Sequence, residues 1–204
     1  VMKMYRWIVT GLLCMMGIGV YALTRIVDID GTGQYTSIQA AINASASGDT
    51  VLVYPGRYFE NISIIQKSNI SVISLEATSG NPTYIESTII DGQSISWGMW
   101  IRQNSQNITI RGFSITNCKN GLSVSSNAIV TIQNCNIFQN KGYNGAGVGV
   151  SFCTVYLSGV KIYNNDAYNM AGGLYINGYM GYVNVTFDPG NRCSIYNNTA
   201  GAGQ

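Results

Sequence analysis

The segment Gly121-Leu122-Ser123-Val124 is one copy of a pattern that the chain repeats: glycine, an apolar residue, any residue, a β-branched residue. The other copies are Gly98-Met99-Trp100-Ile101, Gly147-Val148-Gly149-Val150 and Gly173-Leu174-Tyr175-Ile176. Successive copies start 23, 26 and 26 residues apart. Alternating apolar positions are typical of short strands with one buried face, and a fixed period in this range is typical of a solenoid. The pattern therefore predicts a stack of β coils.

A second element lies between these copies and consists of two apolar residues flanking a variable one, followed by an isoleucine. It occurs as Ile108-x-Ile110 with Ile115, Val130-x-Ile132 with Ile137, Val155-x-Leu157 with Ile162, and Val183-x-Val185 with Ile195. The interval to the isoleucine is 7 residues in three copies and 12 in the last, which indicates an inserted turn around Asp188-Pro189-Gly190-Asn191. Three residues after each isoleucine stands Asn140, Asn165 or Asn198, with Cys118 in the first copy. We expect these asparagines to adopt left-handed backbone conformations at corners and to bond to the equivalent asparagine one coil away.

We predict an all-β fold: a single right-handed parallel β-helix of about six coils with a short N-terminal capping helix. No helical periodicity or leucine-rich consensus supports another solenoid class. The residues expected to be buried are Ile108, Ile110, Ile115, Leu122, Val124, Ile132, Ile137, Val148, Ile162, Leu174 and Ile176.

The part of the chain before the repeats predicts a cap and less regular coils. Residues 51–53, 62–64, 70–72 and 85–90 are apolar enough for early strands, with turns at Pro55-Gly56 and Gly80-Asn81-Pro82. Thr36-Ser37-Ile38-Gln39 has the form of a capping box, which predicts a helix over about residues 36–46. We expect this helix to cover the open end of the stack.

The two ends of the chain also carry predictions. Residues 1–22 combine Lys3 and Arg6 with an apolar run, which predicts a secretory signal peptide; a single membrane-spanning helix is the alternative. The expected division is a signal peptide over 1–22, a cap over 23–50 and a β-helix over 51–204. Since the sequence stops at Gln204 at the start of another coil, we expect further coils and a surface attachment region. Membrane contact would come only through the signal segment or such an anchor, and the protein would be secreted or lie on the outer cell surface.

Composition excludes several classes of function. The chain has no histidine, which rules out histidine-based triads and histidine metal sites. Residues 23–204 carry 9 basic and 9 acidic residues, so there is no electrostatic case for a nucleic-acid partner. We expect no cofactor and no metal. The spacings of Cys118, Cys135, Cys153 and Cys193 match no metal-binding pattern; we interpret these residues as small buried side chains, with disulfides as the alternative.

Two stretches resemble known families. Residues 28–42 and 48–58, which include Asp28-Ile29-Asp30-Gly31-Thr32-Gly33 and Gly48-Asp49-Thr50-Val51-Leu52-Val53-Tyr54-Pro55-Gly56, resemble the N-terminal cap and first coil of pectin-lyase-fold proteins, pectin methylesterases among them. That resemblance implies the fold and leaves the activity open. Ile162 to Asn165 with Gly172-Gly173-Leu174-Tyr175 is similar to the repeats of polymorphic outer-membrane proteins and other bacterial surface passengers. This second resemblance implies a bacterial surface protein.

The resemblance to pectin-modifying enzymes implies clustered carboxylates, because those enzymes place acidic residues across their substrate. From Gly98 to Phe187 the only acidic residue is Asp166, so the repeat region offers no carboxylate pair. The candidate catalytic cluster is Glu86, Asp91, Arg102 and Arg111, with charged surface on early coils as the alternative interpretation.

Outward side chains of the repeat predict a ligand-binding surface instead. If the apolar residues point inward, then Trp100, Ser123, Gly149 and Tyr175 form one outward column, with Trp100 and Tyr175 about 14 Å apart at about 4.8 Å per coil. Together with Tyr179 and Tyr182 they would form a shallow groove for sugar rings, unless tyrosine is merely a favoured strand residue. We expect a monomeric, non-catalytic adhesion or glycan-binding protein whose partner is a neutral or mixed polysaccharide. The alternative is a polysaccharide-modifying enzyme, a pectin esterase or lyase, whose site lies mostly on missing coils.

Overall fold

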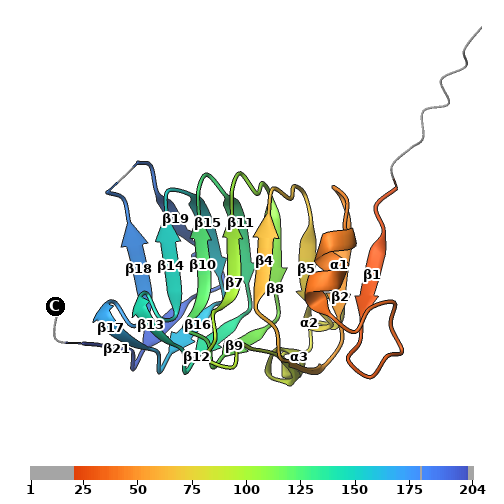
Figure 1. Cartoon of the computed structure of the whole chain (residues 1–204), viewed down its shortest axis with the longest axis horizontal. Helices are drawn as coiled ribbons and strands as arrows, with labels where there is room; N and C mark the ends of the chain where they lie inside the picture. The colour runs from red at the N-terminus through yellow and green to blue at the C-terminus, as the bar shows by residue number, and fades with distance from the viewer. Residues whose placement is uncertain (1–20, 180, 202–204) are drawn as a thin grey trace, which may run out of the picture.

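The computed structural model describes residues 21–179 and 181–201, which form three long parallel sheets, a short fourth sheet and three short helices. The strands stand side by side along the long axis of the molecule, with helix α1 (Ile38–Ala44) near the N-terminal end (Figure 1). The seven-stranded sheet contains β1 (Thr24–Val27), β2 (Thr50–Val53), β5 (Ser71–Ser74), β8 (Ile108–Arg111), β11 (Ile129–Gln133), β15 (Thr154–Ser158) and β19 (Asn184–Phe187). The five-stranded sheet contains β4 (Ile62–Ile65), β7 (Trp97–Arg102), β10 (Asn120–Ser125), β14 (Val148–Ser151) and β18 (Leu174–Asn177).

The other strands form two further sheets. The six-stranded sheet contains β3 (Gly56–Tyr58), β6 (Thr88–Asp91), β9 (Ser114–Thr116), β12 (Asn136–Phe138), β16 (Lys161–Tyr163) and β20 (Ser194–Tyr196). A three-stranded sheet contains β13 (Lys141–Asn144), β17 (Asp166–Met170) and β21 (Thr199–Ala200). From β2 onward, consecutive strands belong to different sheets: β7, β8 and β9 lie in three different sheets, and β10 then returns beside β7. This order is compatible with a β-helix or solenoid-like fold, and the all-β, parallel part of the prediction is confirmed.

The glycine that opens each strand of the repeat marks the place where neighbouring coils come closest. A Cβ on Gly147 would lie 2.6 Å from the Gly173 carbonyl oxygen, 2.6 Å from Ile162 and 2.9 Å from the Asn165 amide. Gly98 and Gly121 are equally crowded by the following glycine and by the isoleucine of the second element. The separate sequence motifs therefore meet at one point in each coil: the glycine, the isoleucine and the asparagine, with Cys118 in place of the asparagine beside Gly98.

The predicted asparagine contacts are present as a ladder, in which Asn140 and Asn165 are buried and Asn198 is half-buried. Asn140 Nδ2 donates to Asn165 Oδ1 at 3.0 Å, and Asn165 Nδ2 donates to Asn198 Oδ1 at 2.9 Å. The expectation that these same residues have left-handed backbones is wrong: that conformation belongs to the preceding residue, for example Asn164 at φ 54° and Asn197 at φ 51°. The exposed residue makes the turn, which frees the next side chain to point inward and bond to its neighbours.

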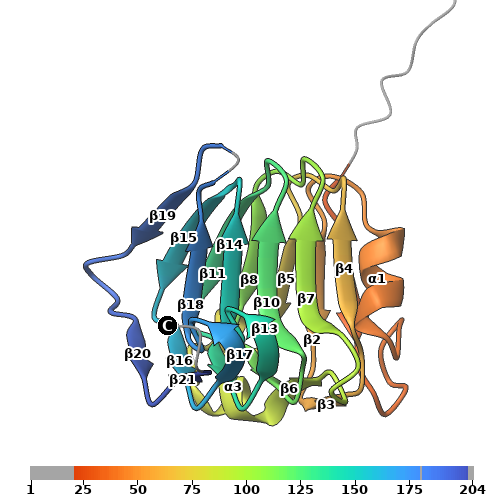
Figure 2. The same cartoon turned by 60° about the vertical axis from the view of Figure 1, so that its left-hand side comes forward.

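The core consists largely of the predicted residues, with one correction at the last described coil. Nine of the eleven are fully buried. Leu174 is half-buried and Ile176 is 49% exposed, because β18 is the outermost strand of its sheet in the described chain. Figure 2 shows β18, β19 and β20 at the end of the stack opposite α1. The side chains of an end strand are covered on one side only.

The N-terminal helix is shorter than predicted and is capped differently. Helix α1 begins at Ile38, after the N-cap Ser37, whose hydroxyl accepts from the Ala40 N–H at 3.2 Å. In place of a capping box, Glu60 from a later loop accepts the Ile38 and Gln39 N–H groups at 2.8 and 2.9 Å. The helix buries its apolar face over the first coil, as expected, and the residues that it buries are Ile38, Ala41 and Ile42.

Residues 76–87 form two short helices, so the strand expected over residues 85–90 begins only at Thr88. Helix α2 (Glu76–Ser79) ends at Gly80, whose φ of 70° suits glycine, and α3 (Thr83–Ser87) starts after Pro82. Proline fixes φ near the helical value and lacks an N–H, so it favours a helix start at this point.

Several sequence-based predictions concern residues outside this description. The signal segment over 1–22 falls there except for its last two residues, as does the end at Gln204. No helix among the described residues has the length and apolar character needed to cross a bilayer. Three of the four later cysteines are buried, Cys193 is half-buried, and all four are free thiols.

Candidate functional site

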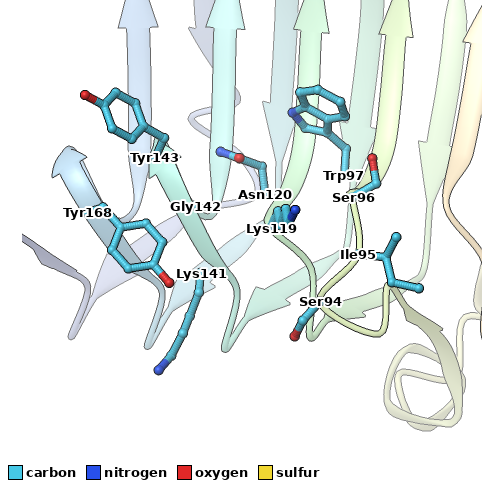
Figure 3. Close-up of a pocket in the computed structure, with 10 residues that line it drawn as sticks. All are labelled: Ser94, Ile95, Ser96, Trp97, Lys119, Asn120, Lys141, Gly142, Tyr143 and Tyr168. Carbon is cyan, nitrogen blue, oxygen red and sulfur yellow. The ribbon is translucent and has the colours of Figure 1, made fainter.

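A groove of about 510 Å³ lies at the start of strands β7 and β10. We call it the aromatic groove. Tyr143 and Tyr168 lie on one side of it and Trp97 on the other, with Lys119 and Asn120 between them (Figure 3). Its lining comprises Ser94, Ile95, Ser96, Trp97, Lys119, Asn120, Lys141, Gly142, Tyr143 and Tyr168.

The repeat itself positions the Trp97 side of the groove. Trp97 and Asn120 each precede the glycine of the repeat and are partners in the parallel register of β7 and β10. The loop before Trp97 is held in place because Asp91 accepts from the Gln93 N–H at 2.9 Å and the Ser94 N–H donates to the Asn117 carbonyl at 2.6 Å. One side of the groove is therefore attached to the core of the stack.

The tyrosine side depends on an irregular edge strand. Tyr143 and Tyr168 are 68% and 69% exposed and come from β13 and β17, whose pairing shifts register between Gly142 and Asn144. Gly142 has no space for a side chain, because a Cβ there would collide with the Lys119 carbonyl oxygen and the Asn120 side chain. Because Gly142 passes so close to Lys119 and Asn120, the tyrosines lie beside these two residues.

The polar groups of the groove are amide, hydroxyl and ammonium groups, and no carboxylate lines it. Asn120 Nδ2 donates to the carbonyl oxygens of Asn144 and Gly145, at 2.6 and 2.9 Å. That fixes the amide plane, and within the described chain no hydrogen bond involves its Oδ1. Such a site can stack against rings and exchange hydrogen bonds with hydroxyl groups, but it lacks a carboxylate acid–base pair.

The predicted ligand-binding column exists in register, but its first ring is covered. Trp100 pairs with Ser123, Ser123 with Gly149, and Gly149 with Tyr175. The Trp100 ring stacks on Trp97 with centroids 4.4 Å apart, and the Arg102 guanidinium lies 3.6 Å from its centroid. Trp100 therefore supports Trp97 and is not itself an open platform.

The other predicted aromatic residues lie apart from the groove lining. Tyr175 is half-buried on β18. Tyr179 and Tyr182 are 91% and 71% exposed in the connection between β18 and β19. These three tyrosines remain candidates for ligand contact only on β18 and on the connection that follows it, outside the groove lining.

The candidate catalytic residues interact with different partners and form no cluster. The Arg111 guanidinium bonds to both carboxylate oxygens of Glu76, at 2.8 and 3.1 Å. Burial by itself raises the pKa of Glu76, but the hydrogen bonds from Arg111 and Asn134 outweigh it and hold that pKa below its ordinary value. This pair therefore fastens α2 to β8.

The two candidate carboxylates, Asp91 and Glu86, do not form an acid–base pair either. Asp91 is 3% exposed, forms an ion pair with Arg57, and accepts from the Asn117 amide at 2.8 Å. Glu86 is exposed on α3. Asp91 is buried and already accepts hydrogen bonds from three groups, and in the described chain no hydrogen bond joins it to a second carboxylate, so it does not make an acid–base pair.

The described residues contain no group of three or more cysteine or acidic side chains that could hold a metal ion. Comparison with protein-family models and with curated proteins finds no match for this chain.

The sequence reasoning missed Trp97, Lys119, Lys141, Tyr143 and Tyr168, although two signals were present. Asn140-Lys141-Gly142-Tyr143-Asn144 and Asn165-Asp166-Ala167-Tyr168-Asn169 repeat one pattern, with a tyrosine three residues after the ladder asparagine. The position before the first two repeat glycines is the other signal, since it holds Trp97 and Asn120.

Proposed function

We propose that this protein is an exported, right-handed parallel β-helix of the pectin-lyase type that binds a neutral or mixed polysaccharide through the aromatic groove, without catalysis. The handedness follows from general experience, because connections between parallel strands of one sheet are right-handed in about 98% of cases. The resemblance of residues 28–58 to pectin-lyase-fold caps supports the same fold.

One observation carries the proposal of glycan binding: three aromatic rings, Trp97, Tyr143 and Tyr168, line one hollow that also offers amide and hydroxyl groups. Exposed aromatic side chains next to hydrogen-bonding groups suit sugar rings, which present both apolar faces and hydroxyl groups. Trp97 and Tyr168 come from coils three steps apart, which is about 14 Å at about 4.8 Å per coil. That length accommodates a short stretch of a polysaccharide.

The direct test is a glycan array with the purified protein, followed by titration of the best ligands against variants. We expect Trp97→Ala and Tyr168→Ala each to weaken binding by at least about tenfold. Tyr156→Ala is the matched control, because Tyr156 is 42% exposed on β15, in the seven-stranded sheet, and should leave binding unchanged.

A parallel assay for release of unsaturated uronate or methanol from pectin addresses the enzymatic alternative. If the wild-type protein releases either product and Asp91→Ala or Arg111→Ala abolishes that release, the protein is an enzyme and the non-catalytic proposal is wrong. Cell fractionation tests export: we expect a mature protein that starts at Leu23 outside the cytoplasm, whereas an uncleaved protein in the inner membrane would contradict it.

A further inference from the structure

The aromatic groove lies in a basic part of the chain. Between Gly98 and Phe187 there are five basic residues, Arg102, Arg111, Lys119, Lys141 and Lys161, and one acidic residue, Asp166. Arg111 is neutralised by Glu76, and Arg102 lies against Trp100. Two of the three lysines line the groove. The zero net charge of residues 23–204 thus conceals a local positive charge.

Lys119 and Lys141 are exposed, and neither takes part in any of the ion pairs of the described chain. Lys119 lies in the middle of the groove, between Trp97 and the tyrosines, whereas the Lys141 side chain points away from them (Figure 3). Asp166 is the partner of Lys141 in the register of β13 and β17 and accepts from the Thr199 hydroxyl at 2.8 Å. Asp166 therefore offsets part of the charge of Lys141, and Lys119 keeps the stronger field.

We propose that the groove selects an acidic saccharide, with a carboxylate or sulfate group held at Lys119 and flanking rings stacked on Trp97 and on the tyrosines. This inference rests on the proposed glycan-binding function and names the charged member of the mixed class. No carboxylate is among the described residues that line the groove, so none of them repels an anion, and the two ammonium groups give the groove a positive potential that attracts one.

The experiment compares matched pairs of probes by titration. One arm uses a uronate-containing oligosaccharide and its carboxyl-reduced form; the other uses a sulfated polysaccharide and its desulfated form. We expect the acidic member of at least one pair to bind at least about tenfold more tightly at low salt and to lose that advantage at about 1 M salt, because salt screens exposed charges. The arm with the larger preference identifies the anionic group.

Lysine variants locate the effect. Lys119→Ala should weaken binding of the acidic member about fivefold more than it weakens binding of the neutral member. Lys141→Ala should reduce this preference less, and Lys119→Arg should retain it. Lys161→Ala is the control, since Lys161 is an exposed lysine on β16, outside the groove.

The outcomes separate this inference from the proposed function. Equal binding of acidic and neutral members, lost in Trp97→Ala but unchanged in Lys119→Ala, overturns the charge selection and leaves glycan binding intact. Absence of binding to every probe and to the array overturns both.

Discussion

Replacement of Asn165 by alanine tests whether the asparagine ladder stabilises the stack. The Asn165 side chain is 1% exposed and makes four hydrogen bonds. Its Oδ1 accepts from the backbone N–H and the side-chain amide of Asn140, at 3.1 and 3.0 Å. Its Nδ2 donates to the Ile137 carbonyl and to Asn198, at 3.0 and 2.9 Å.

The expected loss follows from these contacts. A buried hydrogen bond contributes about 1 kcal/mol net, and an orphaned buried partner costs about 1–3 kcal/mol. Asn165→Ala should therefore lower the free energy of unfolding by about 4 kcal/mol. The assay is urea denaturation followed by circular dichroism, with the midpoint shift read at an unchanged slope.

Asn164→Gly is the matched control for the ladder. Asn164 is the exposed neighbour at φ 54°, a conformation that glycine adopts freely, so this variant should change stability by less than about 0.5 kcal/mol. A loss below about 1 kcal/mol in Asn165→Ala would refute the view that the ladder holds the coils together. The double variant with Asn140→Ala should be non-additive, because the two side chains share hydrogen bonds.

Three further predictions concern packing and titration. Gly147→Ala should destabilise the protein by about 1–3 kcal/mol, because its Cβ would lie 2.6 Å from the Gly173 carbonyl oxygen, whereas Gly149→Ala, where the nearest atom is 3.9 Å away, should be nearly neutral in the same denaturation assay. Backbone N–H groups of Ala46 and Leu23, together with Arg25, hold the pKa of Asp49 below its ordinary value. This stabilisation is present above the unfolded pKa of about 4 and is lost as pH falls below it. In Asp49→Asn the denaturation midpoint should therefore depend less on pH between about pH 2 and 5 than in the wild-type protein. Burial raises the pKa of three thiols, to about 12 for Cys118 and to about 11 for Cys135 and Cys153. These thiols should therefore resist a thiol-exchange reagent at pH 8 until urea unfolds the chain. Rapid labelling of the native protein would contradict their burial.

Local periodicity explains what was predictable about the fold. Strand alternation decides which side chains face inward within a few residues, and the repeat period decides which residues share a column. The positions of Leu122, Val148 and the ladder residue Asn165 therefore follow from the sequence. The prediction was wrong where the local pattern is interrupted. Residues 76–87 form helices around Pro82, and Ile176 lacks a described neighbour on one side.

The amino-acid sequence by itself determined the parallel stack, its core and its outward columns, because these depend on spacing along the chain. Only the tertiary structure decided which corner residues meet. Trp97, Lys119 and Tyr168 converge because neighbouring coils align in register, and Trp100 is unavailable because Trp97 covers it. Likewise, Arg111 pairs with Glu76 from 35 residues earlier, since the partner of a charged side chain depends on contacts between coils that spacing within one repeat does not encode.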